Sequence, residues 1–332
     1  MQLAAAKSFG DADAADRPQT PGTDVPCSPK GMSRLPIADA DAPKWSRGEG
    51  RRPQWHWAFR PDGLATSFAH AMETGDTYVL DDAGHLYRVT RGGQLAGLNR
   101  PPDDIRHIAW AADGSLGAAI VGDRGLMTIT QGLKVRWTVE LPDDILTIAV
   151  DPHGHYVVAA IADGGNLVYS LRRRKVAAFS TIRPIAHWQF LCHEPLLVGA
   201  AEHGLLCCHT LGGERIWEEK ILSTCGSMSS AGDGRRTLMA AFTHGVQVFD
   251  EIGETVGAYM VEGASAKCRC SYTAERMLTL TLERQAFWMD EDGDILWVGS
   301  LPEDPIDAVV DPLGDWAMIA MPGEGVCKLG WE

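Results

Sequence analysis

The sequence has no long apolar run: nowhere does it approach the ~18 consecutive apolar residues that a membrane-spanning helix requires. It is also short of positive charge, with 30 Lys and Arg against 44 Asp and Glu, which gives a formal net charge of −14. Because nucleic acids bind mainly through clustered Lys and Arg, we expect no nucleic-acid partner. We likewise expect no direct insertion into a membrane.

The first residues lack the basic start and apolar stretch of a secretory signal, and Asp11, Asp13 and Asp16 are atypical of a transit peptide. Without an export signal, the eight cysteines are expected to be thiols of a reducing compartment rather than a disulfide framework. We therefore predict a cytoplasmic protein.

Residues 1–49 lack hydrophobic periodicity and are rich in Ala, Asp, Pro, Gly and Ser. Such a composition cannot bury enough apolar surface to fold alone. We therefore predict an extended or disordered N-terminal tail over 1–49, which either stays without contacts or becomes ordered on a partner. Its candidate anchors on a partner are Leu35, Ile37 and Trp45. Residues 50–332 are expected to form the folded domain.

The rest of the chain carries a repeat of forty residues, with seven rows that start at 65, 105, 145, 185, 225, 265 and 305. Each row begins with a segment such as ATSFAH, IRHIAW or ILTIAV, in which the fourth position is apolar or a thiol and the third is polar. This alternation predicts a strand with two different faces. The polar third positions are Ser67, His107, Thr147, His187, Ser227, Lys267 and Asp307.

Further strands and turns recur in the same phase. The turns DPHG at 151 and DPLG at 311 lie four periods apart, and turns with glycine precede most of the third strands. In the fourth strand, Trp137, Trp217 and Trp297 stand eight residues before the next row. In rows 1, 3 and 5 this position holds Gly97, Ala177 and Gly257.

The last row contains only three strands, and the missing one is supplied from the other end of the repeat. Trp57 lies eight residues before the first row, so its segment has the phase of a fourth strand. We predict that residues 52–60 pair as the outer strand of the row 305–332. The fold expected is all-β: a seven-bladed β-propeller of four-stranded antiparallel blades, closed by an N-terminal strand and preceded by the tail.

The rows resemble degenerate WD-repeat blades, and the Gly-x-x-x-Trp strands are similar to blades of the quinoprotein-like propellers. Phe249-Asp250 and Met289-Asp290 stand where a WD dipeptide would. The other rows hold Val89-Thr90, Ile129-Thr130, Tyr169-Ser170, His209-Thr210 and Leu329-Gly330 there. The resemblance covers about 50–332 and implies the propeller fold.

Row 4 is dense in residues that can bind metals: His187, Cys192, His193, His203, Cys207, Cys208 and His209. However, Cys207 and His209 are in phase with apolar residues of the other rows, and free Cys behaves as a small apolar residue. We therefore predict core positions for Cys207 and His209, as for Cys268, and no metal site or cofactor. The sequence also lacks a Ser-His-Asp arrangement, a phosphate loop and a His-Glu-x-x-His motif, so we expect no enzyme.

In a propeller, the connections between blades and the turns between second and third strands share one face. Sorting the charges by this rule places an excess of acids on that face, which either steers a cationic partner or serves solubility alone. The candidate partner-binding acids are Asp103, Asp104, Asp143, Asp144, Asp163, Glu303 and Asp304.

Two functions fit these patterns. The first is a non-catalytic scaffold that binds other proteins, as a subunit of a larger assembly with the tail as a strap on a partner. The alternative is a propeller that binds a small ligand or metal at its central channel, as a binding protein or as an enzyme, because the polar third positions recur there once in every blade.

Overall fold

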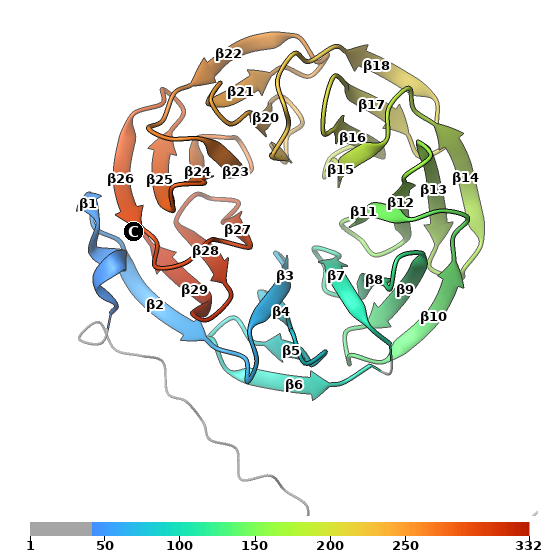
Figure 1. The fold of residues 1–332 in the computed structure, drawn as a ribbon, viewed down its shortest axis with the longest axis horizontal. Coiled ribbons are helices and arrows are strands. Elements are labelled where there is room, and N and C mark those ends of the chain that lie inside the picture. The colour runs from blue at the N-terminus through green and yellow to red at the C-terminus, as the bar shows by residue number, and fades with distance from the viewer. Residues whose placement is uncertain (1–41, 102, 332) are drawn as a thin grey trace, which may run out of the picture. The chain divides into compact units, whose positions relative to one another are not determined.

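The computed structural model describes residues 42–101 and 103–331. They form seven antiparallel sheets arranged as a ring, with the first strand of each sheet nearest the centre and the last at the rim (Figure 1). The prediction of a seven-bladed β-propeller is therefore confirmed. No helix among these residues is long and apolar enough to span a membrane.

The strands follow the forty-residue rows. Blade 1 consists of β3 (Ala65–Ala71), β4 (Asp76–Asp81), β5 (Leu86–Val89) and β6 (Leu95–Asn99). Blade 2 consists of β7 (Ile105–Trp110), β8 (Leu116–Val121), β9 (Gly125–Thr130) and β10 (Val135–Glu140). Blade 3 consists of β11 (Ile145–Val150), β12 (Tyr156–Ile161), β13 (Gly165–Ser170) and β14 (Lys175–Ser180). Blades 4 and 5 consist of β15 (Ile185–Phe190), β16 (Leu196–Ala201), β17 (Leu206–Thr210) and β18 (Arg215–Glu219); and β19 (Ser227–Ser230), β20 (Thr237–Ala240), β21 (Val246–Phe249) and β22 (Thr255–Tyr259). Blade 6 contains β23 (Ser265–Cys270), β24 (Arg276–Thr281), β25 (Gln285–Asp290) and β26 (Ile295–Ser300), and blade 7 contains β27 (Asp307–Val310), β28 (Trp316–Met321) and β29 (Gly325–Gly330).

The ring is closed by β2 (Gln54–Phe59), which pairs with β29 as the outer strand of blade 7. In this register Trp57 lies opposite Lys328 and Phe59 lies opposite Val326. The predicted closure by residues 52–60 is confirmed. Trp55 and Trp57 are both buried, so the closing strand contributes to the core as well as to the hydrogen-bond ladder.

Two short elements precede the closing strand. The 3-10 helix η2 (Lys44–Arg47) contacts blade 6, and β1 (Glu49–Gly50) pairs with β26, which gives blade 6 a fifth strand. Trp45 packs edge-on against Trp55 with ring centroids 5.8 Å apart. Residues 42–49 of the predicted tail thus lie against the propeller.

The turns between third and fourth strands share one capping device. In six blades the residue that ends the third strand or follows it accepts the backbone N–H of the residue four positions later, through a side-chain oxygen. These residues are Thr90, Thr130, Ser170, Thr210, Asp250 and Asp290. The position that would hold Asp in a WD dipeptide therefore serves a local hairpin cap here.

The same turns require a left-handed backbone at one position. Four blades place glycine there: Gly93, Gly213, Gly253 and Gly293. Blades 2 and 3 place Leu133 and Arg173 there instead, with φ of 61° and 63°. Left-handed φ is unfavourable for residues with a Cβ, so these two turns are strained relative to the others.

Two outer-strand tryptophans donate to the third turn of the next blade, whereas Trp297 Nε1 donates to Arg47 O at 3.3 Å. Trp57 Nε1 donates to the carbonyl oxygen of Arg91 at 3.0 Å, and Trp137 Nε1 donates to that of Leu171 at 3.0 Å. The repeated Trp of the fourth strand is thus an anchor between neighbouring blades.

The blades without this Trp use the residue two positions later on the same strand. Asn99 Nδ2 donates to the carbonyl oxygen of Leu133 at 2.6 Å, and Tyr259 Oη donates to that of Glu291 at 2.7 Å. In blade 3, Phe179 lies over Gly213, where any Cβ would collide with the ring. Side chains two residues apart lie on the same face of a strand. These residues therefore reach the next blade from the same face as the Trp of the other blades.

The closing strand supports a first prediction. A chain that starts at residue 64 lacks β2, which removes two buried tryptophans and the outer ladder of blade 7. Its free energy of unfolding should fall by at least ~5 kcal/mol, measured by chemical denaturation. A chain that starts at residue 42 is the control and should unfold like the full protein; equal stability of the shorter chain would disprove closure by β2.

The strained turns support a second prediction: glycine at two equivalent positions should change the free energy of unfolding in opposite directions. Arg173→Gly should raise the free energy of unfolding by ~0.5 kcal/mol, because relief of the left-handed strain exceeds the added freedom of glycine in the unfolded chain. Leu133→Gly should lower it by ~2 kcal/mol, because Leu133 is buried and its removal leaves a cavity. Thermal and denaturant unfolding measure both, and changes of the same sign would contradict this account.

Candidate functional site

The connections between blades and the turns between second and third strands lie on one face of the ring, as expected. Backbone hydrogen bonds join them: Asp82 N donates to Leu64 O at 2.9 Å, and Gly122 N donates to Asp104 O at 2.9 Å. We call this surface the junction face, formed by residues 60–64, 100–104, 141–144, 181–184, 220–226, 260–264 and 301–306 together with the second turns.

One half of the junction face is acidic. The junctions between blades 6 and 7, 7 and 1, 1 and 2, and 2 and 3 are consecutive around the ring (Figure 1). They hold six of the seven predicted partner-binding acids, Asp103, Asp104, Asp143, Asp144, Glu303 and Asp304, while Asp163 lies in the second turn of blade 3.

Some of these acids are held in place and others are free. Arg124 Nε lies 3.0 Å from Asp144 Oδ1, and Arg284 Nε lies 2.7 Å from Asp304 Oδ1, an equivalent pair four rows later. The hydrogen bond and the positive charge of Arg284 lower the pKa of Asp304. In the part of the chain that the structure describes, five of the seven acids make no ion pair. Asp143, Asp163 and Glu303 accept backbone N–H groups, whereas no side-chain hydrogen bond is seen for Asp103 and Asp104.

In the other half of the junction face, exposed apolar side chains occupy the junctions, a feature absent from the sequence-based prediction, while Glu202 and Glu283 lie in the second turns of blades 4 and 6. The junctions of blades 3 to 6 present Ile182, Leu222 and Met260 with 69, 93 and 65% of their surface exposed. Leu282, in the second turn of blade 6, is also exposed, and Glu262 is the one acid in these three junctions. The signal in the sequence is the loss of Asp from these junctions and its replacement by Ile, Leu and Met.

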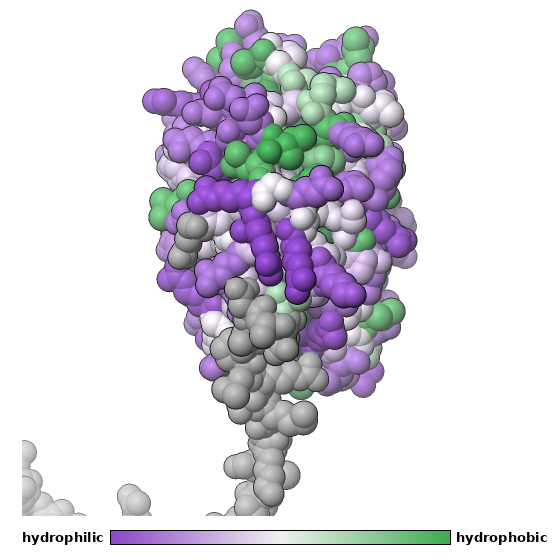
Figure 2. Space-filling model, turned by 90° about the vertical axis from the view of Figure 1, so that its left-hand side faces the viewer, coloured by the Kyte–Doolittle hydropathy of each residue, from purple (hydrophilic) through white to green (hydrophobic). Residues whose placement is uncertain are grey.

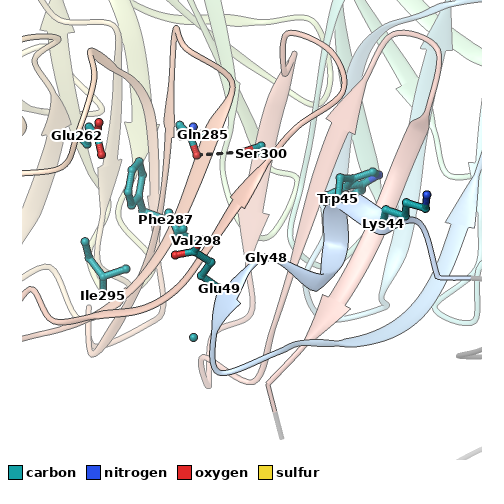
Figure 3. Close-up of a pocket in the computed structure, with 11 residues that line it drawn as sticks. Lys44, Trp45, Gly48, Glu49, Glu262, Gln285, Phe287, Ile295, Val298 and Ser300 are labelled. Atoms are coloured by element: carbon teal, nitrogen blue, oxygen red, sulfur yellow. Dashed lines mark hydrogen bonds between the residues drawn. The ribbon is translucent and has the colours of Figure 1, made fainter.

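A hollow at the rim of blade 6 is the second candidate site (Figure 3). Phe287 and Val298 form its apolar floor, Ile295 lies at one end, and Glu49 of β1 borders it. Gln285 Oε1 accepts a hydrogen bond from Ser300 Oγ across the upper end, at 3.4 Å. The hollow lies beside the η2–β1 segment, which covers only part of the β26 edge.

The rim around this hollow carries free positive charge. Lys44, Arg47, Arg51 and Arg52 are exposed, and none makes an ion pair with another described residue. The view of this side shows mostly hydrophilic side chains, with a hydrophobic patch beside them (Figure 2).

The predicted tail anchors separate into two groups. Trp45 is partly buried against blades 6 and 7 of its own chain, where it joins the core cluster that contains Trp55. Leu35 and Ile37 lie outside the described residues.

In the cysteine- and histidine-rich row 4, Cys207 and His209 lie in the core, as predicted, whereas Cys192, His193 and His203 are exposed. Cys207 and Cys208 are buried, and burial raises the pKa of both thiols, to about 11 for Cys208. His209 stacks on Phe179 with ring centroids 5.0 Å apart, and burial lowers its pKa. Over residues 42–101 and 103–331, no three His, Cys, Asp or Glu side chains are grouped so as to hold a metal ion.

The channel-facing positions of the first strands are tied together by side chains. Arg269 Nη2 lies 2.6 Å from Asp307 Oδ2 in blade 7, and its Nη1 donates to Met228 O in blade 5 at 3.2 Å. Its Nε donates to Ala308 O at 3.1 Å, so this one side chain bridges three blades. Burial acts against the charge of Asp307, but Arg269 and Lys267 outweigh it and lower the pKa of this carboxyl group.

No family model matches the chain, and a search of the curated proteins finds no match. The class of the protein is therefore set by its fold alone: it is a seven-bladed β-propeller, a fold that commonly serves as an interaction scaffold.

The Arg269 bridge supports a third prediction. Arg269→Met removes donors from Asp307 and from two carbonyl groups of neighbouring blades. The free energy of unfolding should fall by ~2–3 kcal/mol, since hydrogen bonds to charged groups contribute more than neutral ones. Arg172→Met, at an exposed turn, is the control and should change stability by less than ~0.5 kcal/mol; equal effects of the two substitutions would refute the bridge.

Proposed function

We propose that the protein is a non-catalytic interaction scaffold that docks a protein partner on its junction face. The observation that carries this proposal is the division of that face into an apolar half, with Leu222 93% exposed, and an acidic half. Exposed apolar groups of this kind, bordered by charge, are typical of interaction surfaces. A surface that served solubility alone would favour charge in all seven junctions.

The two halves define the chemistry of the partner. Ile182, Leu222 and Met260 suit an apolar patch on the partner, since burying them removes large apolar side chains from water. The unpaired Asp103 and Asp104 suit Lys or Arg beside that patch, and their field would speed the encounter. The partner proposed is thus a protein with an apolar patch next to a basic one, within a cytoplasmic assembly.

The tail completes the proposal. Residues 1–41 would act as a strap on the same or another subunit, with Leu35 and Ile37 as its anchors. A second contact of this kind adds avidity through a raised effective concentration.

The test compares substitutions on the two faces. Ile182→Ser with Leu222→Ser should reduce recovery of partners at least about tenfold in quantitative affinity purification from the native cell. Leu313→Ser is the matched control, since Leu313 is 81% exposed in the first turn of blade 7, on the opposite face. All variants should unfold like the wild type, because these side chains are exposed. Unchanged partner recovery with the junction-face variant would sink the proposal.

The acidic half is tested separately once a partner is in hand. Asp103→Asn with Asp104→Asn should slow association and flatten its dependence on salt, while stability should barely change. If association keeps its salt dependence, the acids contribute to solubility and the apolar half alone docks the partner.

A further inference from the structure

A separate feature lies at the centre of the ring, on β23 of blade 6. In this strand Cys268 is completely buried between the sheets, whereas Lys267 and Arg269 on either side of it are partly exposed. Because β23 is the innermost strand of its blade, solvent reaches these two side chains from the axis of the propeller (Figure 1). Two cations therefore face the channel of a protein whose net charge is −14.

The two cations differ in their hydrogen-bond partners. Arg269 donates to Asp307, to Ala308 O and to two further carbonyl groups, so its guanidinium is fully engaged. Lys267 makes no hydrogen bond and no ion pair with any residue that the structure describes. The ammonium group of Lys267, which solvent reaches, is therefore a donor with no acceptor among the described side chains and carbonyl groups.

Lys267 is the third residue of the innermost strand of blade 6, the same position that His107 takes in blade 2 and His187 in blade 4. Burial, with smaller contributions from Lys267 and Arg269, lowers the pKa of His187 to about 4. Burial also lowers the pKa of His107 in blade 2; Asp307 opposes this, and Lys267 and Arg269 add to it. The three side chains thus share one position on innermost strands around the axis.

The opposite side of the channel offers room and further donors. Blades 1 to 3 place only Ala69, Ala109 and Ala149 at the position equivalent to Arg269. Ser67 Oγ accepts the N–H of Ile108 at 3.2 Å and lies 3.1 Å from His107 Nδ1. When the hydroxyl donates to Nδ1, the ring proton is on Nε2, so the exposed His107 ring is a hydrogen-bond donor as well.

We propose that the channel binds a small oxyanion, a phosphate or a carboxylate group, with Lys267 as the main ligand and His107 and His187 as flanking donors. With both histidines neutral, the group of Lys267, Arg269 and Asp307 carries a net charge of +1, which an anion neutralises. An oxyanion supplies the acceptors that the ammonium group lacks. This site is independent of the junction face and of any partner bound there.

Isothermal titration calorimetry of the full-length protein with inorganic phosphate, and separately with malonate, tests the site. At least one of the two anions should bind in the millimolar range or tighter. Lys267→Met should weaken that binding at least about tenfold, while Lys134→Met, at the exposed third turn of blade 2, should leave it unchanged. The anion that binds more tightly identifies the chemistry of the natural ligand.

Thermal unfolding supplies the second measurement. Without added anion, Lys267→Met should unfold within a few degrees of the wild type, because the lost attraction to Asp307 is opposed by the lost repulsion from Arg269. The stabilising anion should raise the unfolding temperature of the wild type and of Lys134→Met, but not that of Lys267→Met. Absence of binding by both anions at about 10 mM, or equal binding by Lys267→Met, would overturn the proposal.

Discussion

The pairing of β2 with β29 is the constraint on which the ring depends, since it joins the N-terminal strand to the last blade in one sheet, directly before the chain enters blade 1. The four strands of each of the other six blades are consecutive in the chain, with β1 added at the edge of blade 6, whereas blade 7 needs an N-terminal strand to reach four. The same strand carries Trp57, whose indole N–H reaches the third turn of blade 1. The β2–β29 hydrogen bonds and the Trp57 contact thus act together at the place where the two ends of the repeat meet.

Much of this fold is predictable because the repeat has a constant length. The phase of Trp57 gave the closing strand, and the polar and apolar alternation gave the inner strands. The anchors of blades 1, 3 and 5 were not predictable, because Gly97, Ala177 and Gly257 occupy the expected position. Asn99 and Tyr259 replace the Trp two residues later, and a side chain of different chemistry at a shifted position leaves no periodic signal.

The candidate surfaces were predictable only in part, for a related reason. Charged side chains in turns lie at the surface whatever their neighbours are, so the acidic half of the junction face could be found by assigning each acid to its turn. The apolar half consists of single side chains such as Leu222, and whether one apolar residue is buried or exposed depends on its neighbours in space. In the same way, the sequence placed Lys267 in the polar ring, but the absence of an acceptor became visible only with the surrounding blades in place.

The order of attachment of the N-terminal segment has a mechanical consequence. Tension applied to the residues before η2 reaches β1 before it reaches β2, and β1 is held to β26 by a pair of only two residues. This short pair therefore detaches first, and the released residues lengthen the segment under tension. Until that segment is fully extended, the longer ladder between β2 and β29 bears no force. The pairing of β1 with blade 6 thus protects the closure of the ring.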